Sequence, residues 1–545
     1  MYRFDLSESY IPAQTDDVVL ETTVGGILRD AVRERGGATA LVEVDERGEN
    51  HRRWTFSELL ADSERLAAAL ASRYAPGERL VVWAPNVPEW VLMEFACGLA
   101  GLVLVTANPS YQKDELRYVL EQSGASALFS VASFRGNPMA EIGAAAAGGL
   151  DAVREIVDLD DRAALFRTGD RPAALPGVAP GDAAQIQYTS GTTGFPKGAV
   201  LSHRALTNNA RFFARRTDTR PDSVWANFMP MFHTSGCGMI TLGALQAGCP
   251  VFLVKQFDPA AVLRLIERER VTAALGVPTM LVAMLECLDR QPPDRQPLDR
   301  QPCDLSSVEI AVSGGSMVAP ELVRKCVERF GCSFQTVFGQ TESAPLITQH
   351  HAGEPLDIVC NTAGLPMPQT EVSIRSVDGE NRVLPVGEVG EICVRGYCVM
   401  IGYHDNPSAT AEAIDAESWL HTGDLGTLDR QGYLRITGRV KEMIIRGGEN
   451  LFPAEIENTL LEHPDVAEVA VVGLPDDKWG EIVACFVRLE PGRDFDPEEL
   501  HRHCRARISP QKTPAVWQAV EGFPLTGSGK IRKFALVEDY LAAGG

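Results

Sequence analysis

A glycine-rich segment between two short apolar runs most constrains the fold and function of this chain. The segment is Tyr188-Thr-Ser-Gly-Thr-Thr-Gly-Phe-Pro-Lys-Gly198. Ala184–Tyr188 before it is a predicted strand, and Ala199–His203 after it is a second predicted strand that runs into a helix at Arg204. Glycine lets backbone N–H groups approach an anion closely, hydroxyl groups add donors, and Lys197 adds a positive charge. The segment therefore predicts a polyphosphate site between two strands.

Length, charge and cysteine usage narrow the class of protein. A chain of 545 residues is too long for one ordinary core, so we expect two or more domains. With 51 basic and 73 acidic residues the net charge is −22, which argues against general nucleic-acid binding. An anionic ligand must therefore be held by local positive groups.

The sequence also bears on location. The N-terminus has no apolar segment typical of a secretory signal, and no apolar run is long enough to span a bilayer. The 12 cysteines are scattered without a C-x-x-C pair, which predicts reduced thiols in a cytoplasmic protein. His501-Arg-His-Cys504 resembles a set of metal ligands, but no second ligand pair follows at zinc spacing, so polar residues on an exposed helix are the favoured interpretation.

The chain changes character along its length. The first part alternates helical and strand patterns, such as the helix Thr55–Leu70 followed by the strand Arg79–Ala84, which predicts parallel sheets covered by helices. A Pro-rich repeat over 289–302 predicts an exposed loop. Shorter β segments begin near Thr370, and a compact α+β unit of about a hundred residues follows Arg439.

Further motifs extend the pattern of the glycine-rich segment over nearly the whole chain. They are Phe338-Gly-Gln-Thr-Glu342, Thr422-Gly-Asp424, Gly438-Arg-Val-Lys-Glu442, Arg446-Gly-Gly-Glu-Asn450 and Gly527-Ser-Gly-Lys530. Together and in this order they resemble the adenylate-forming superfamily, which includes acyl-CoA synthetases, adenylation domains of peptide synthetases and luciferases. The resemblance implies an α/β fold. A large N-terminal domain of helix-covered β-sheets with a β-rich subdomain, 1–438, would precede a small mobile α+β domain, 439–545, with a hinge near Lys441.

The resemblance implies an ATP site with Mg²⁺. Glu342 would hold the metal, a hard cation that prefers oxygen ligands, and Thr341 would contact the α-phosphate. Asp424 and Arg439 would meet the ribose. The residues implied around the β- and γ-phosphates are Thr189, Ser190, Gly191, Thr192, Thr193, Gly194 and Lys197. Those implied around the adenine and the acyl group are Gly314, Gly315, Ser316, Phe338 and Gly339.

Several of these motifs also have ordinary structural interpretations. Thr341-Glu342 is typical of a helix start, where the threonine caps and the acid favours the dipole. Thr422-Gly-Asp424 is compatible with a simple turn, and Gly314-Gly-Ser316 with a routine connection between a strand and a helix. A lone histidine such as His233 is usually a core residue. Each motif taken alone leaves both interpretations open.

The same resemblance implies a second half-reaction with coenzyme A. Lys530, on a glycine-rich loop, would stabilise adenylation and then withdraw as the small domain rotates about Lys441. Gly448 would let pantetheine pass close to the backbone, Arg446 would contact phosphates, and His233 would line the acyl pocket and the thiol route.

The motifs Arg395–Tyr403 and Met443–Pro453 are similar to those of medium-chain fatty acyl-CoA synthetases, and the implied pocket is small or apolar. We therefore expect a medium- or long-chain fatty acid, or a similar apolar or aryl acid. The partners are then an acid, ATP and CoA, without nucleic acid or a membrane span. The sequence leaves the oligomeric state open, with a homodimer as one candidate. Alternatives are a carrier-protein acceptor, nitrite activation for diazotising an aryl amine, and a non-catalytic ligand-binding homologue.

Overall fold

The computed structural model describes residues 4–170, 175–189, 196–289, 303–447, 449–476, 478–525 and 531–543. The chain forms two compact units. The larger unit comprises Pro12–Glu371 and Val394–Leu420, and the smaller unit comprises Met1–Ile11, Val372–Cys393 and His421–Gly545. The β segments that follow Thr370 are thus grouped mostly with the C-terminal residues. The predicted boundary between 1–438 and 439–545 concerns which segments move as one body, and it stays a prediction.

One sheet of the larger unit carries the glycine-rich segment. Its strand order is β19-β9-β8-β5-β4-β6-β7. The strands are β4 (Arg79–Trp83), β5 (Val103–Ala107), β6 (Ala127–Ser130), β7 (Glu155–Asp158), β8 (Ala183–Thr189), β9 (Lys197–Ser202) and β19 (Gly402–Tyr403). β8 continues the parallel part of the sheet, whereas β9 and β19 are antiparallel to their neighbours. The predicted strands on both sides of the segment are confirmed.

A second sheet of the larger unit has the order β16-β15-β14-β13-β12-β10-β11-β2-β3. Its strands are β2 (Thr39–Val44), β3 (Asn50–Thr55), β10 (Trp225–Asn227), β11 (Val251–Val254), β12 (Ala273–Leu275), β13 (Ile310–Gly314), β14 (Ser333–Gly339), β15 (Leu346–Gln349) and β16 (Leu365–Pro366). The central strands are parallel and buried, as expected for a sheet with helices on its faces.

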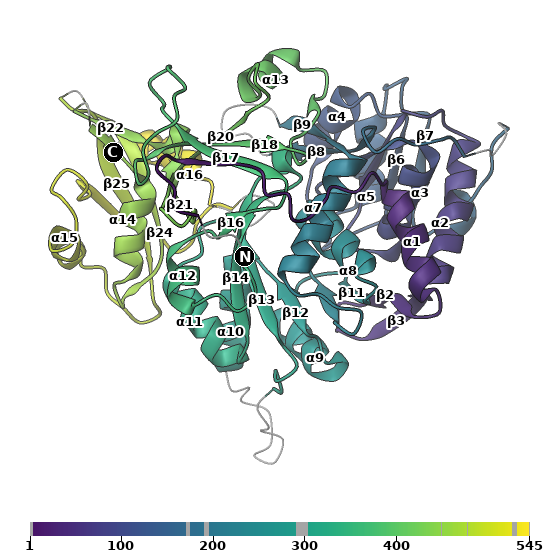
Figure 1. The fold of residues 1–545 in the computed structure, drawn as a ribbon, viewed down its shortest axis with the longest axis horizontal. Coiled ribbons are helices and arrows are strands. Elements are labelled where there is room, and N and C mark those ends of the chain that lie inside the picture. Colours follow the sequence, from purple (N-terminus) through teal and green to yellow (C-terminus); the bar gives the residue numbers. More distant parts are fainter. Residues whose placement is uncertain are drawn as a thin grey trace. The chain divides into compact units, whose positions relative to one another are not determined.

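Local sequence signals set the helix ends in the larger unit. Thr55 and Glu58 form a reciprocal capping box at the start of α2 (Phe56–Ala71). α3 (Pro88–Ala100) begins with proline, ends at left-handed Gly101, and is buried along its whole length. The other helices are α1 (Val24–Arg35), α4 (Lys113–Gln122), α5 (Met139–Ala147), α6 (Arg162–Leu165), α7 (His203–Arg216), α8 (Gly243–Gln246), α9 (Pro259–Glu269), α10 (Pro278–Asp289), α11 (Pro320–Phe330), α12 (Leu356–Asn361) and α13 (Pro407–Ala413). Helices α10, α11 and α12 lie side by side next to β13 and β14 (Figure 1).

The smaller unit contains two sheets. One has the order β1-β17-β18-β20-β21, and the other has the order β23-β22-β25-β24 with β26 paired to β25. The strands are β1 (Tyr10–Ile11), β17 (Thr370–Arg375), β18 (Gly390–Gly396), β20 (Leu420–Leu428), β21 (Leu434–Arg439), β22 (Ile444–Arg446), β23 (Glu449–Leu451), β24 (Val466–Asp476), β25 (Gly480–Leu489) and β26 (Val516–Ala519).

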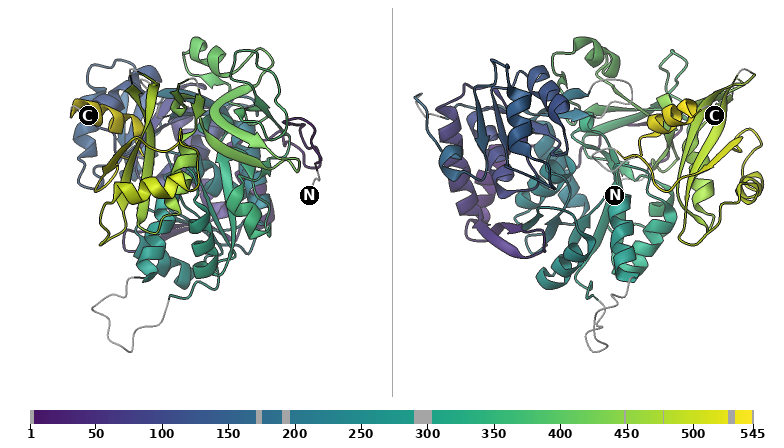
Figure 2. Two further views of the ribbon diagram at one scale, coloured as in Figure 1. Left: turned by 90° about the vertical axis from the view of Figure 1, so that its left-hand side faces the viewer. Right: turned by 180° about the vertical axis from the view of Figure 1, so that it is seen from behind.

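Helices cover both faces of β24. Val469 and Val471 pack in one apolar cluster with Ile456 of α14 (Pro453–Leu461), and Ala470 and Val472 pack in another with Leu536 of α16 (Lys533–Ala542). Alternate strand residues point to opposite faces, so the two helices lie on opposite sides of the strand (Figure 2). α15 (Pro497–Arg505) packs against α14. The predicted fold class, helix-covered sheets with a smaller α+β unit, is confirmed.

The predicted loop over 289–302 lies, except for Asp289, outside the described residues. Within the described part of the chain, none of the helices has both the length and the apolar character that crossing a membrane requires.

His203 links the start of α7 to the N-terminal helix α1. Its side chain is fully buried, and its Nδ1 accepts a hydrogen bond from the Val24 backbone N–H (3.3 Å). Burial lowers the pKa of His203 from 6.5 to about 4, because the imidazolium would lose its hydration. The neutral ring is therefore the form that the fold accepts.

We expect acid to weaken the larger unit through His203. In the unfolded chain His203 becomes protonated below pH 6.5, whereas in the folded chain it stays neutral down to about pH 4. The folded state is therefore destabilised as the pH falls through this window. The loss for this residue between pH 7 and pH 5 is about 2 kcal/mol. His203→Gln keeps an acceptor for Val24 and should remove this share from the pH dependence of urea unfolding. Exposed His501→Gln is the control, and an unchanged pH slope in His203→Gln would contradict the assignment.

Candidate active site

The β8–β9 hairpin holds the two ends of the glycine-rich segment. Thr189 and Lys197 are register partners at the end of the hairpin that the connecting segment joins, and Thr189 Oγ1 donates a hydrogen bond to the Lys197 carbonyl (3.4 Å). The predicted residues Ser190, Gly191, Thr192, Thr193 and Gly194 lie outside the described residues. The hairpin therefore fixes where this segment starts and ends.

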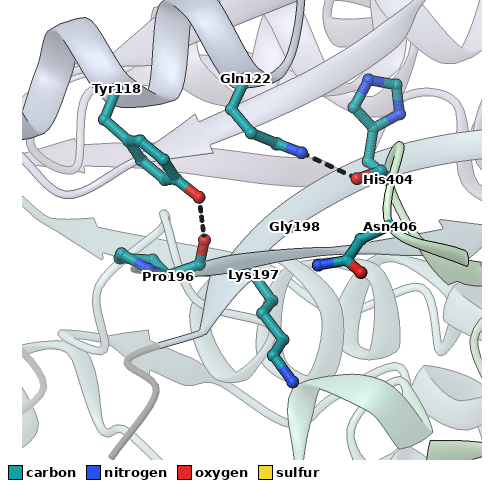
Figure 3. Close-up of a pocket in the computed structure, with 7 residues that line it drawn as sticks. All are labelled: Tyr118, Gln122, Pro196, Lys197, Gly198, His404 and Asn406. Atoms are coloured by element: carbon teal, nitrogen blue, oxygen red, sulfur yellow. Dashed lines mark hydrogen bonds between the residues drawn. The ribbon is translucent and has the colours of Figure 1, made fainter. Parts of the chain in front are cut away.

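A cavity of about 250 Å³ lies beside the second end of the segment (Figure 3). Tyr118 Oη donates to the Pro196 carbonyl (2.8 Å), and Gln122 Nε2 donates to the His404 carbonyl (2.8 Å). The His404 N–H donates to the Gly198 carbonyl (2.8 Å). These bonds attach β9 to α4 on one side and to the residues after β19 on the other. The Lys197 side chain points away from Tyr118 and Gln122 in the same view.

The predicted metal ligand Glu342 lies in a single 3₁₀ turn, Thr341–Ser343, after β14. Gln340 occupies the cap position of this turn, so Thr341 is not the capping residue. Glu342 is buried, and its Oε1 accepts a hydrogen bond from Tyr403 Oη (2.7 Å). Burial raises the pKa of the Tyr403 hydroxyl, which keeps it protonated and able to donate. A carboxylate oriented in this way offers the hard oxygen donor that Mg²⁺ prefers.

Lys197 and Glu342 come together through the same tyrosine. The Lys197 ammonium lies 4.9 Å from the centroid of the Tyr403 ring, within the range of a cation–π interaction. The structure thus assembles a predicted phosphate-binding lysine and a predicted metal-binding acid around one side chain. Sequence reasoning missed Tyr403, although it lies in the segment Arg395–Tyr403.

The predicted adenine and acyl residues lie where β13 and β14 end. Gly314 pairs with Val337, and a methyl group at Gly314 would lie only 2.4 Å from the Val337 carbonyl oxygen. Gly315 has a φ of +82°, and Ser316 is exposed. A methyl group at Gly339 would lie 1.9 Å from the Pro345 carbonyl oxygen, next to buried Phe338. The glycines at both strand ends are therefore required by close backbone approach.

His233 precedes a π-helical segment, Ser235–Leu242. The His233 carbonyl accepts hydrogen bonds from the N–H groups of Gly236 and Cys237, so the residue forms the turn into this segment. π-helical turns are rare and frequently occur at functional sites. Sequence patterns gave no signal for this segment.

Asp424 and Arg439 pair across β20 and β21 in the smaller unit. They are register partners, and Arg439 Nε donates to Asp424 Oδ1 (2.8 Å). Asp424 is buried with only 5% of its surface exposed. Its motif is part of strand β20 and not a simple turn, with Gly423 at a φ of +71°.

Glu391, a residue outside the predicted set, holds this motif in place. Glu391 accepts a hydrogen bond from the Gly423 N–H through Oε1 (2.9 Å), and its Oε2 lies 2.8 Å from His421 Nδ1. Cys393 Sγ is 3.5 Å from the same nitrogen. The side-chain atoms of Glu391, Cys393 and His421 that could bind a metal lie within 4.8 Å of one another, and the hydrogen bonds among them account for this proximity. The Glu391 carboxylate thus supports the backbone next to Asp424.

Further predicted residues of the smaller unit are Lys441, Arg446, Gly448 and Lys530. Lys441 is exposed in a single 3₁₀ turn, Val440–Glu442. Arg446 Nη1 donates to the Gln511 carbonyl (3.0 Å), and its guanidinium lies 5.2 Å from the centroid of a Trp479 ring. Gly448 and Lys530 lie outside the described residues.

The predicted exposed polar cluster of α15 is exposed only in part. Cys504 is buried in an apolar cluster, and His503 Nε2 is 2.8 Å from the Thr459 carbonyl oxygen. His501 is exposed.

Comparison with known proteins extends over nearly the whole chain. The family model described as AMP-binding enzyme matches residues 28–404, and the model described as AMP-binding enzyme C-terminal domain matches residues 455–530. YngI of Bacillus subtilis (strain 168) is 35% identical over 549 residues, covering 95% of this chain and 97% of YngI. The mitochondrial medium-chain acyl-CoA ligase ACSF2 of Homo sapiens is 35% identical over 573 residues, covering 97% of this chain and 89% of that protein.

A solved structure agrees with these matches. O-succinylbenzoate coenzyme A synthetase (MenE) from Bacillus subtilis, in complex with ATP and a magnesium ion, superposes with a TM-score of 0.78 at 28% identity. The superposition covers 95% of this chain and 100% of that one.

The support that Glu391 gives to Gly423 leads to a prediction. Glu391→Ala removes the acceptor of the Gly423 N–H and should loosen the backbone that presents Asp424, weakening ATP binding roughly tenfold, the worth of one good hydrogen bond. Calorimetry with ATP measures the effect. Exposed Glu388→Ala, near the start of the same strand, is the control and should bind as the wild type does. Equal affinities for Glu391→Ala and the wild type would show that Glu391 does not position Asp424.

Proposed function

Because this chain belongs to the AMP-binding enzyme family, we propose that it joins a carboxylic acid to coenzyme A at the expense of ATP. In the first half-reaction a carboxylate oxygen attacks the α-phosphorus of ATP, the bond to the β-phosphate breaks, and pyrophosphate leaves. In the second, the thiolate of coenzyme A attacks the acyl carbon, and AMP leaves with the bridging oxygen. The thioester and AMP are thus both formed from the same acyl-adenylate.

The observation that carries this proposal is that Lys197 and Glu342 both contact Tyr403, the lysine through the ring and the acid through the hydroxyl group. The first step brings two anions together, so an enzyme must neutralise phosphate charge and hold the reactants in line. Lys197 supplies a cation at the end of the glycine-rich segment, and Glu342 supplies an oxygen ligand suited to Mg²⁺. When bound, Mg²⁺ neutralises charge on the phosphate oxygens.

The remaining assignments follow the motif resemblance. Thr189 and the segment 190–194 would surround the terminal phosphates, and Thr341 would contact the α-phosphate. Asp424 would accept hydrogen bonds from the ribose, with Arg439 holding the carboxylate from the side. Gly314, Gly315, Ser316, Phe338 and Gly339 would border the adenine and the acyl group, and His233 would border the acyl group and the thiol.

We infer an apolar acid as the substrate, such as a medium- or long-chain fatty acid or an aryl acid. Apart from His233, the residues assigned to the acyl site are small or apolar, which favours burial of a hydrocarbon over a second charged group. The name of the human relative, a medium-chain acyl-CoA ligase, supports the same choice.

We further propose that the C-terminal residues move as one body between the half-reactions, with a hinge near Lys441. The exposed position of Lys441 between β21 and β22 supports this location. Lys533, three residues after Lys530, pairs with Glu442 (3.1 Å) and Glu457 (2.7 Å). These ion pairs would tie the base of the lysine loop to the hinge. Rotation would then withdraw Lys530 and bring Gly448 and Arg446 to coenzyme A.

A cytoplasmic location is part of the proposal. It is supported by the cysteines, because the structure contains all 12 as thiols and most are buried in the two units.

A screen of acids for pyrophosphate release, with and without coenzyme A, tests the function. We expect apolar acids to release pyrophosphate and AMP, with thioester forming only when coenzyme A is present. Adenylation without any thioester would replace coenzyme A with another acceptor, such as a carrier protein. No acid-dependent pyrophosphate release would contradict the proposal.

Lys530→Ala should separate the half-reactions. Loss of its charge from the transition state should slow adenylation by at least about a hundredfold, as for one electrostatic donor in other active sites. Thioester formation from preformed acyl-AMP should remain near the wild-type rate. Quenched-flow measurement of each half-reaction gives the comparison, with exposed Lys325→Ala as the control. Equal loss in both half-reactions would contradict a role confined to the first.

A further inference from the structure

Main-chain hydrogen bonds fix the position of Tyr403 independently of the contacts that its side chain makes. β19 pairs with β9 so that Tyr403 is opposite Ala199, two residues from Lys197. The His404 N–H donates to the Gly198 carbonyl (2.8 Å), and the Tyr403 N–H donates to Thr410 Oγ1 (2.9 Å). A strand residue held on both sides has little freedom to change its position.

The same short segment also holds the turn that carries Glu342. The Met400 N–H donates to the Glu342 carbonyl (2.8 Å), and Tyr403 Oη donates to the Glu342 carboxylate (2.7 Å). Residues 400–404 therefore contact both the end of the glycine-rich segment and the metal-binding turn. All of these contacts lie within the larger unit.

The two polar contacts of Tyr403 use different parts of its side chain. The hydroxyl group takes up one oxygen of Glu342, which fixes the rotation of the carboxylate and leaves metal coordination to the other oxygen. The face of the ring lies 4.9 Å from the Lys197 ammonium. Lys197 and Glu342 have opposite charges, yet the tyrosine between them gives each its own partner. The acid and the lysine are thereby kept available for a metal ion and for phosphate.

We propose that Tyr403 is a positioning residue that sets the Mg²⁺ affinity through its hydroxyl group and the ATP affinity through its ring. The inference rests on the proposed function, because it takes Glu342 as the metal ligand and Lys197 as the phosphate ligand. Tyr403 itself contacts neither reacting atom in this account.

Two substitutions separate the two roles. Tyr403→Phe removes the hydroxyl group and keeps the ring under Lys197, so it should weaken metal binding about 10- to 100-fold, as for partners of metal-binding carboxylates. ATP affinity at saturating Mg²⁺ should stay near the wild-type value. Tyr403→Leu also removes the aromatic face and should weaken ATP binding at saturating Mg²⁺ by a further factor of about 2 to 5.

The control is another tyrosine of the larger unit. Tyr74 Oη donates to Glu155, so Tyr74→Phe removes the same kind of hydrogen bond outside the site. Its metal and nucleotide affinities should equal those of the wild type. Thermal unfolding of each variant checks that the fold is intact, and Tyr403→Phe alone decides the hydroxyl role if Tyr403→Leu does not fold.

Binding, and not activity alone, provides the measurement. Electron paramagnetic resonance of Mn²⁺ with α,β-methylene-ATP gives the metal affinity, and calorimetry of ATP at saturating Mg²⁺ gives the nucleotide affinity. Weaker Mn²⁺ binding in Tyr403→Phe with unchanged ATP affinity supports the proposal. Equal Mn²⁺ affinities in Tyr403→Phe and the wild type would overturn it while the proposed function stands. A wild-type protein that binds no metal with nucleotide would instead overturn the assignment of the site.

Discussion

The pairing of β9 with β8 on one side and β19 on the other is the constraint on which the site in the larger unit depends. The first pairing holds Thr189 opposite Lys197, and the second places Tyr403 next to Lys197. Because register fixes which side chains share a face, a slip of one residue between β9 and β19 would turn Lys197 and Tyr403 to opposite faces of the sheet. The hydrogen bonds from α4 and from His404 to 196–198 oppose such a slip.

Local charge matters in this chain because its net charge is −22. A polyanion would be repelled by such a protein unless cations are held where it binds. Each described cation assigned to ATP has a dedicated partner: the Tyr403 ring faces Lys197, and the Asp424 carboxylate pairs with Arg439. Both partners restrict their cations without a fully buried ion pair. The partner of Lys197 is a neutral ring, and the Arg439 side chain keeps 42% of its surface exposed. Held in this way, the cations lose less conformational entropy when phosphate or ribose binds.

Sequence patterns predicted the elements that depend on neighbouring residues. The strands around the glycine-rich segment, the helix α2 with the strand β4 after it, and the α+β unit after Arg439 all follow from periodicity and from glycine or proline at element ends. The motifs also singled out Glu342, Lys197 and Asp424 as candidate site residues, because these residues lie in continuous segments with distinctive order.

Contacts between distant segments could not be predicted in the same way. Tyr403 meets Glu342 across 61 residues of sequence, and Glu391 meets Gly423 across 32, so no local pattern marks either pair. The grouping of Val372–Cys393 with the C-terminal residues depends on sheet pairing between remote strands. The π-helical segment after His233 has a hydrophobic sequence that suits an α-helix equally well.

The fate of the oxygen atoms of the acid tests the central claim most directly. If the enzyme forms an acyl-adenylate and then a thioester, a carboxylic acid labelled with ¹⁸O in both oxygens must give one label to AMP and keep the other in the thioester carbonyl. Mass spectrometry of the products after a single turnover with coenzyme A measures this distribution. The account predicts AMP with one ¹⁸O and pyrophosphate with none. Label in pyrophosphate or orthophosphate, or AMP without label, would contradict it.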